Sequence, residues 1–233
     1  MGATESRAAL AGHDWLDAGQ REQIERVLAT IAADAHAPTT VRDPEQALDV
    51  HVLDALVALE IEAVRMARRI VDIGSGAGFP GVALAIALPQ TELWLLESQR
   101  RKCEFLARLC TTCGVANARV ACTRVEEWSA GACNNDVALA RALAPQPVVL
   151  EYAAPLLRVG GTLVDWRGRR GPEVESASGR AASLLGMRRM EVRQVHPFPG
   201  ARDRHLHVFV KAGETPARFP RRAGMAHKRP LAG

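Results

Sequence analysis

The sequence has 233 residues, of which 48% are hydrophobic and 24% are charged, and a formal net charge of +4. This composition is typical of a globular protein, and the length suits one large α/β domain with an extension or two small domains. No apolar run reaches membrane-spanning length and no signal-peptide pattern is found, so we expect a cytoplasmic protein with no membrane partner.

Charge is unevenly distributed along the chain. Residues 1–60 contain 4 Lys and Arg against 11 Asp and Glu, whereas residues 141–233 contain 17 against 7. A basic C-terminal part suits a polyanionic partner such as nucleic acid. The five cysteines are an odd number without a secretory context, so we expect reduced thiols. Cys110 and Cys113 form a lone C-x-x-C that lacks a second ligand pair, and we predict no metal site.

Two helices are predicted in the first 62 residues. Apolar residues at helical spacing indicate one helix from about Asp17 to Ala33. Asp43 is expected to cap a second helix that begins at Pro44 and continues to about residue 59. On that helix His51 lies three residues before Asp54, so the two side chains share a face, as a packing contact or as part of a site.

A short apolar strand is predicted at residues 69–73, followed by a glycine-rich turn and a helix over residues 81–88. Pro80 suits the first helical position because its missing N–H has no intrahelical partner there. Glycines are needed where the backbone turns sharply and a ligand must approach the main chain. This stretch therefore predicts the first βα unit of a nucleotide-binding fold.

Two ligand classes fit this turn. Gly76, Gly78 and Gly81 match G-x-G-x-x-G, the dinucleotide fingerprint, which favours an NAD(P)-dependent oxidoreductase. Counted from Asp72, the same stretch reads D-x-G-x-G-x-G, the pattern of S-adenosylmethionine-dependent methyltransferases, and includes Gly74. A carboxylate suits the cationic amino-acid part of that methyl donor, whereas a pyrophosphate would repel it. We favour the methyl donor and keep the oxidoreductase as the alternative.

The next three strands are predicted to end at ligand-binding positions. Residues 93–97 form a strand ending in Glu97, whose carboxylate would reach the ligand ribose. A helix over residues 99–113 and a strand over residues 118–122 follow, and then Val125 would cover the face of an adenine with Glu126 at its edge. The strand over residues 136–140 places Arg141 at its carboxyl end.

The C-terminal part is predicted as a helix over 148–157, a strand over 162–166, a helix over 173–185 and an antiparallel pair of strands, 188–195 and 206–211. Such an ending is more typical of methyltransferases than of dehydrogenases. The tail from residue 215 onward is basic and rich in proline, so we expect it not to fold alone and to contact RNA phosphates. The basic residues expected to contact RNA are Arg167, Arg169, Arg170, Arg218, Arg221, Arg222, Lys228 and Arg229.

Several blocks, taken in order and spacing, resemble the bacterial small-subunit ribosomal RNA guanine-N7 methyltransferases, the glucose-inhibited division protein B family. They are Val41-Arg42-Asp43-Pro44, His51-Val52-Leu53-Asp54, Asp72 to Gly81, Arg124-Val125-Glu126-Glu127, Arg141-Ala142, Arg204-His205-Leu206 and Phe219-Pro220-Arg221-Arg222. The chain departs from the family at Ala37-Pro38-Thr39, where Asn-Leu-Thr is usual, and at Arg167-Gly168, where Lys-Gly is usual.

The resemblance implies a class I S-adenosylmethionine-dependent methyltransferase fold, which is Rossmann-like with a mostly parallel seven-stranded sheet. It divides the chain into an N-terminal helical extension (1–62), a methyltransferase domain (63–213) and a basic, flexible tail (214–233). The donor pocket carried over from the family comprises Gly74, Phe79, Val125, Glu126 and Arg141. To these the glycine motif and the second strand add Asp72, Gly76, Gly78 and Glu97.

The resemblance also implies methyl transfer to N7 of one guanosine in the decoding-region loop of 16S rRNA. Guanine N7 carries a lone pair and no proton, so the attack needs no general base, and catalysis can rest on positioning. We therefore name no catalytic acid or base, and His51 and Arg141 are positioning candidates only. The expected partner is 16S rRNA or an assembling small subunit, and we expect a monomer. A non-catalytic RNA-binding module remains a further alternative.

Overall fold

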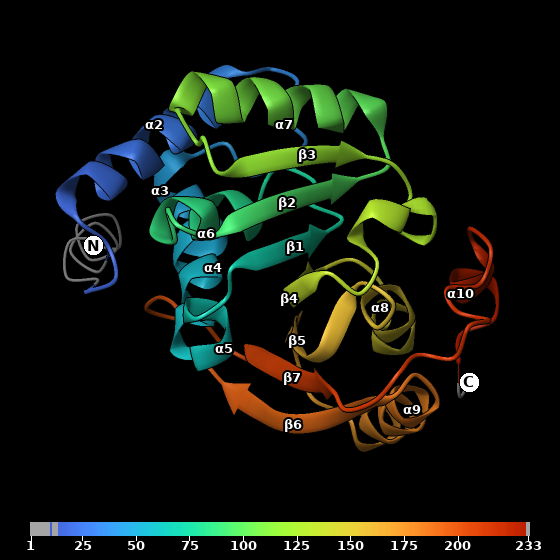
Figure 1. Ribbon diagram of the computed structural model, residues 1–233. Helices are drawn as coiled ribbons and strands as arrows, with labels where there is room; N and C mark the ends of the chain where they lie inside the picture. Colours follow the sequence, from blue (N-terminus) through green and yellow to red (C-terminus); the bar gives the residue numbers. More distant parts are fainter. Residues whose placement is uncertain (1–9, 11–13, 232–233) are drawn as a thin grey trace.

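The computed structural model describes Leu10 and residues 14–231. A seven-stranded sheet with the order β3-β2-β1-β4-β5-β7-β6 forms its centre (Figure 1). Strands β1 to β5 run parallel, and β7 is antiparallel to both of its neighbours, β5 and β6. This confirms the predicted fold class. The strands are β1 (Arg69–Ile73), β2 (Glu92–Glu97), β3 (Ala118–Cys122), β4 (Asn135–Arg141), β5 (Leu157–Arg167), β6 (Met187–Gln194) and β7 (His205–Lys211).

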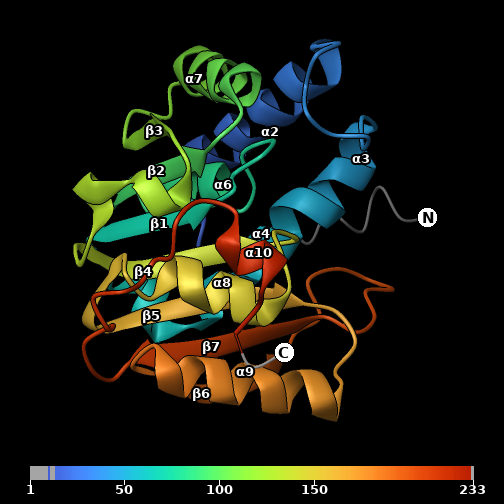
Figure 2. The ribbon, with the colours of Figure 1, turned by 90° about the vertical axis from the view of Figure 1, so that its right-hand side faces the viewer.

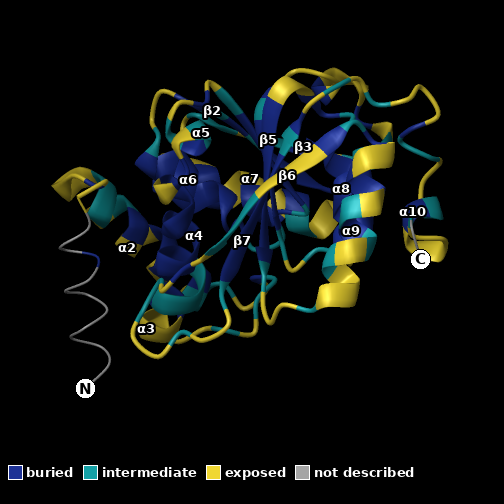
Figure 3. Cartoon of the chain, turned by 90° about the horizontal axis from the view of Figure 1, so that it is seen from below, coloured by how far each residue is buried: buried dark blue, intermediate teal, exposed yellow. Residues whose placement is uncertain are grey.

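Helices cover both faces of the sheet and bury a separate hydrophobic core on each (Figures 1 and 3). One face packs against α2, α6, α7 and the second helical segment, and the other against α8 and α9. Both faces of the parallel strands are therefore apolar, as expected where helices cover each side. The bounds are α2 (Ala18–Ala33), α6 (Gly81–Ala87), α7 (Arg100–Cys113), α8 (Gln146–Ala153) and α9 (Pro172–Leu184).

The N-terminal helices belong to the same core as the sheet. Asp17 and Gln20 form a capping box at the start of α2, and the Asp43 side chain accepts from the Gln46 N–H to cap the second segment, as predicted. That segment is not a regular helix, since it passes through a π-helical turn that contains His51. Its parts are α3 (Pro44–Ala47), η1 (Leu48–Leu53), α4 (Asp54–Leu56) and η2 (Val57–Glu60), followed by α5 (Glu62–Arg65). The boundary at residue 62 stays a prediction.

Strand β5 begins earlier than the sequence indicates. The helix predicted to reach Leu157 ends at Ala153, and β5 starts at Leu157 and runs through the two glycines that were expected to precede it. Gly160 has a φ of +84°, and a Cβ on Gly161 would lie 3.0 Å from the Asn135 carbonyl oxygen. The glycines are therefore a bulge where β5 passes close to β4, and the register shifts there.

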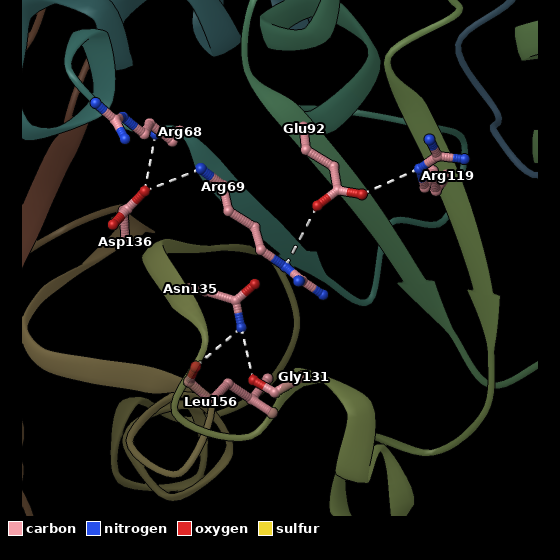
Figure 4. Close-up of polar contacts among 8 residues, drawn as sticks. All are labelled: Arg68, Arg69, Glu92, Arg119, Gly131, Asn135, Asp136 and Leu156. Atoms are coloured by element: carbon pink, nitrogen blue, oxygen red, sulfur yellow. Dashed lines mark hydrogen bonds and ion pairs between the residues drawn. The ribbon is translucent and has the colours of Figure 1, made fainter.

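Polar contacts tie the amino ends of the strands together (Figure 4). The Asp136 carboxylate accepts from the backbone N–H groups of Arg68 and Arg69 at 2.8 and 2.9 Å. Glu92 bonds the Arg119 guanidinium at 3.0 Å and lies 3.7 Å from that of Arg69. In open α/β sheets ligands bind at the opposite, carboxyl ends, so these contacts anchor the sheet away from the expected site.

The C-terminal tail is packed rather than free. Residues 216–231 turn back along α8 and include a short helix, α10 (Met225–Lys228) (Figure 2). Phe219 and Ala226 are buried in the core formed with α8 and α9. These residues pack on α8 because apolar side chains spaced along a basic segment find a surface to cover. That the tail is flexible stays a prediction. Residues 232 and 233 lie outside the described part.

Two cysteines differ from expectation. Cys103, in the first turn of α7, and Cys122, at the end of β3, form a disulfide with a Cα–Cα distance of 5.7 Å. The prediction of five reduced thiols is wrong for this pair, because the fold places residues 19 apart in sequence side by side. Cys110, Cys113 and Cys133 are free. Across the described residues, no group of three His, Cys, Asp or Glu side chains could hold a metal ion, and no helix is long and apolar enough to cross a membrane.

Candidate active site

A cavity of about 510 Å³ opens at the carboxyl ends of β1, β2 and β4. It brings together most of the residues predicted for the donor site, although they come from segments far apart in the sequence. The predicted residues that line it are His51, Gly74, Gly76, Phe79, Glu97, Val125, Glu126 and Arg141.

The glycine turn forms one wall of this cavity. Gly74 has a φ of +75° and Gly76 a φ of +54°, in the left-handed region that favours glycine. The Gly74 N–H donates to the Leu96 carbonyl at 2.8 Å, which ties the turn to the end of β2. A Cβ on Gly76 would meet only the Gly74 carbonyl oxygen, at 3.8 Å. The turn therefore leaves open space above Gly76 where a ligand can approach the backbone.

Asp72 and Gly78 support this wall from behind and do not line the cavity. Asp72 is 1% exposed, and its Oδ2 accepts from the Gly81 N–H at 3.1 Å. Burial raises the pKa of Asp72 to about 6. A Cβ on Gly78 would lie 2.8 Å from Val82 Cγ2. In the structure both residues hold the start of α6 against β1. That they contact the ligand stays a prediction.

Glu97 occupies the position predicted for a ribose-binding acid. Its Oε2 accepts from the Gly76 N–H at 3.2 Å, and its Oε1 accepts from the N–H groups of Ser98 and Gln99 at 2.8 and 2.9 Å. A carboxylate can accept about four hydrogen bonds, so it retains capacity for a hydroxyl donor. Lys102, from the first turn of α7, lines the same part of the cavity.

The far end of the cavity is bounded by Val125, Glu126, Tyr152 and His227. Glu126 Oε1 accepts from the Gly224 N–H at 3.0 Å. Sequence patterns did not indicate Tyr152, which lies within an apolar helix, or His227, which lies in the tail. Leu143 and Thr39 also line the cavity without having been predicted, and no local signal marks them.

At the other end His51 stacks on Phe79, with ring centroids 5.0 Å apart and an angle of 11° between the ring planes. Its Nε2 lies 3.1 Å from Thr39 Oγ1. Burial, followed by the charge of Arg141, lowers the pKa of His51 to about 4, so the ring is neutral at pH 7. Of the unusual Ala37-Pro38-Thr39 segment, Ala37 is buried in the core and the other two residues line the cavity.

Arg141 links the sheet to the N-terminal helices. Its Nη1 donates to Asp54 Oδ2 at 2.9 Å and to the Val50 carbonyl at 3.0 Å. Asp54 is 6% exposed, and its carbonyl accepts from Trp166 Nε1 at 2.8 Å. Asp54 therefore pairs with Arg141 rather than with His51, and the guanidinium lines the cavity while it fixes the η1–α4 segment over β4 and β5.

The residues predicted to bind RNA fall into two groups. Four pair with carboxylates: Arg167 with Asp165 at 2.6 Å, Arg170 with Glu175 at 2.6 Å, Arg221 with Glu151 at 2.8 Å and Arg169 with Asp203 at 3.9 Å. Asp165 is buried, and burial raises its pKa to about 6. The remaining residues, Arg218, Arg222, Lys228 and Arg229, are exposed at the surface, and so are Arg169 and Arg170.

The cavity fits an adenosine-containing sulfonium donor. The open space above Gly76 admits a ligand to the backbone, Glu97 offers a carboxylate at the end of β2, and the volume of about 510 Å³ is within the range of small-molecule sites. With an antiparallel β7 inserted between β5 and β6, the fold and cavity define a class I S-adenosylmethionine-dependent methyltransferase. The oxidoreductase alternative is not favoured.

Comparisons with known proteins agree with this class. The GidB family, described as rRNA small subunit methyltransferase G, matches residues 22–206. "Ribosomal RNA small subunit methyltransferase G" of Rubrobacter xylanophilus is 42% identical over 82% of this chain and 76% of its own length. The protein of the same name from Syntrophomonas wolfei is 41% identical over 79% of this chain and 86% of its own length. The chain belongs to the GidB family.

Solved structures show the same fold at low sequence identity. A SAM-dependent methyltransferase from Aquifex aeolicus is 15% identical, with a TM-score of 0.56 over 71% of this chain and 93% of its own. A predicted O-methyltransferase, Atu636 from Agrobacterium tumefaciens, is 24% identical, with a TM-score of 0.53 over 70% of this chain and 80% of its own.

Proposed function

We propose that this chain transfers a methyl group from S-adenosylmethionine to N7 of a guanosine in the decoding-region loop of 16S rRNA. The observation that carries the proposal is the cavity at the carboxyl ends of the strands. There the open space above Gly76 lies next to the Glu97 carboxylate. The rRNA substrate is supported by membership of the GidB family, whose relatives are named ribosomal RNA small subunit methyltransferase G.

The donor supplies an electrophilic methyl group: a bond from N7 to carbon forms as the bond from sulfur to carbon breaks, and the sulfur leaves as a neutral thioether. In this reaction no proton leaves N7, so the protein needs no base. The neutral His51 ring, held flat on Phe79, suits a positioning role because it adds no positive charge beside a purine that becomes cationic. Arg141 acts through Asp54 to hold that segment in place.

On the donor side, we propose that Glu97 accepts hydrogen bonds from the ribose, and that Val125 and Glu126 bound the adenine. Gly74 and Gly76 admit the donor to the backbone. We propose that exposed basic residues, namely Arg169, Arg218, Arg222, Lys228 and Arg229, contact RNA phosphates. We further propose that the enzyme acts as a monomer on an assembling subunit.

The direct test is to incubate the protein with labelled S-adenosylmethionine and either naked 16S rRNA, partly assembled subunits or complete subunits, and to map the label by mass spectrometry. We expect one methylated guanosine in the decoding-region fragment. Methylation of a different position would contradict the substrate assignment, and RNA binding without methylation would support the non-catalytic alternative. The molar mass of the free protein, measured by light scattering, tests the proposal that it is a monomer.

A further inference from the structure

The C-terminal segment from Pro216 to Leu231, here called the strap, crosses α8 (Figure 2). Through His227 it also reaches the donor cavity. Its anchor is Arg221, whose Nε and Nη2 donate to the two oxygens of Glu151 at 2.8 and 2.5 Å. The Arg221 backbone N–H adds a third bond to Glu151, at 3.2 Å. Glu151 is fully buried. The two-point geometry fixes the strap in one orientation on α8.

Beyond this anchor the strap contributes directly to the cavity. Gly224 takes a φ of +80°, and its N–H donates to Glu126 Oε1 at 3.0 Å. His227, on the helix that follows, lines the cavity, and its ring centroid is 6.1 Å from that of Tyr152. The strap therefore supplies both a side chain at the cavity wall and a backbone donor to a cavity carboxylate.

Glu126 is the point where the strap and the donor site meet. Its carboxylate faces the Gly224 N–H on one side and the Tyr152 hydroxyl on another. Burial, followed by the negative charge of Glu126, raises the pKa of Tyr152 to about 12, so the hydroxyl stays protonated beside the carboxylate. A shift of the strap would free one oxygen of Glu126 and open the wall at His227.

We propose that the strap is a wall of the methyl-donor site, with His227 as a positioning residue, and that strap docking and donor binding stabilise each other. The proposal rests on the assignment of this cavity to S-adenosylmethionine. It adds a role at the donor site to the sequence-based expectation that the tail contacts RNA phosphates. Because linkage is reciprocal, the strap must favour the bound donor by the same factor by which the donor favours the docked strap.

The first experiment measures the affinity for S-adenosylhomocysteine by calorimetry in the absence of RNA. His227→Ala should weaken binding by roughly fivefold or more, the lower end of the usual range of coupling between linked sites. His227→Phe, which keeps a planar ring at this position, should restore most of the loss. Lys228→Ala is the matched control, because Lys228 is exposed on the same short helix and does not line the cavity. An unchanged affinity in His227→Ala would overturn the proposal.

The second experiment uses trypsin, since the strap carries exposed Arg218, Arg222 and Lys228. Saturating S-adenosylhomocysteine should slow cleavage within the strap of the wild-type protein by roughly fivefold or more, and should protect the His227→Ala variant less. Equal cleavage with and without ligand would also overturn the proposal. Failure of the wild-type protein to bind S-adenosylhomocysteine at all would instead contradict the donor assignment, so the two failures are distinguishable.

Discussion

Gly76 and Gly81, two glycines of the βα turn, have different roles, and substitutions can distinguish these roles. Gly76 faces the cavity with only one backbone atom near its missing Cβ, whereas a Cβ on Gly81 would collide with Leu95 and Asp72. Gly76 therefore leaves space for a ligand, and Gly81 is required for the packing of α6 on the sheet.

We expect Gly76→Val to abolish binding of S-adenosylhomocysteine while the protein stays folded. The side chain would extend into the cavity, and its positive φ would cost only about 1 to 2 kcal/mol of folding free energy. Calorimetry measures the affinity, and circular dichroism checks the fold. Gly213→Val is the control, since nothing lies within 4 Å of its Cβ and it does not line the cavity. Normal affinity in Gly76→Val would contradict the proposal that the donor occupies the space above Gly76.

Asp72 should make the stability of the protein depend on pH. Its pKa is raised to about 6 by burial, above the value of about 3.9 for an unfolded chain. Between these values the folded state binds more protons than the unfolded state, so stability falls as pH rises from about 4 to about 6.

Asp72→Asn removes this titration, and its Oδ1 can still accept from the Gly81 N–H. From pH 4.5 to pH 7.5 the variant should therefore gain roughly 2 kcal/mol relative to the wild type. Urea unfolding at both pH values measures the difference, in which the titration of Asp165 cancels because both proteins contain it. A difference that does not change with pH would show that Asp72 is not the titrating group.

At the scale of elements, an ion pair between the partly exposed Arg221 and the fully buried Glu151 anchors the strap. Arg221→Met would leave the fully buried Glu151 without its partner, so we expect a loss of roughly 3 kcal/mol in the free energy of unfolding. The double variant Glu151→Met/Arg221→Met should recover most of this loss, because no buried charge then remains unpaired. Chemical denaturation of the wild type, both single variants and the double variant measures the free energy of unfolding of each, from which the coupling energy between Glu151 and Arg221 follows. Additive losses would contradict the pairing.

Elements defined by local chemistry could be predicted from the sequence. The capped starts of α2 and α3, the glycine turn and the antiparallel pair β6 and β7 depend on neighbouring residues, and the structure has them close to the predicted positions. The early start of β5 could not be predicted, because Gly160 and Gly161 are strand residues only in the presence of the β4 backbone. The π-helical turn at His51 likewise has no local sequence signal.

The residues of the candidate site likewise include some that the sequence predicts and some that it does not. Gly76 and Glu97 follow from the position of each residue at the end of a strand, which periodicity reveals. Tyr152 and His227 come to the cavity only through tertiary packing of α8 and the strap, and neither lies in a motif. Asp72 was predicted to contact the ligand because it lies near the end of β1. The direction of its side chain, toward the Gly81 N–H, depends on where α6 packs and has no local sequence signal.

At the scale of the whole molecule, the structure shows where the acidic and basic parts of the chain lie relative to the cavity. Residues 18–60, in the acidic N-terminal part of the chain, form helices over one face of the sheet, and the basic strap lies beside the cavity. An RNA attracted to the strap would therefore arrive next to the donor site. Arg167 and Arg221 are neutralised by the buried carboxylates of Asp165 and Glu151, so we expect the exposed basic residues to determine the contact with RNA.

Salt dependence of RNA affinity tests this arrangement. Each phosphate contact contributes about one to the slope of log affinity against log salt concentration, so Arg218→Gln/Arg222→Gln should reduce the slope by about two. The control Arg26→Gln/Arg119→Gln removes the same net charge from residues paired with Glu22 and Glu92, and Arg119 lies at the amino end of β3, away from the cavity. Fluorescence anisotropy with a decoding-region RNA fragment at several salt concentrations gives both slopes. Equal slopes for the two double variants would show that net charge alone, and not the position of the strap, governs RNA binding.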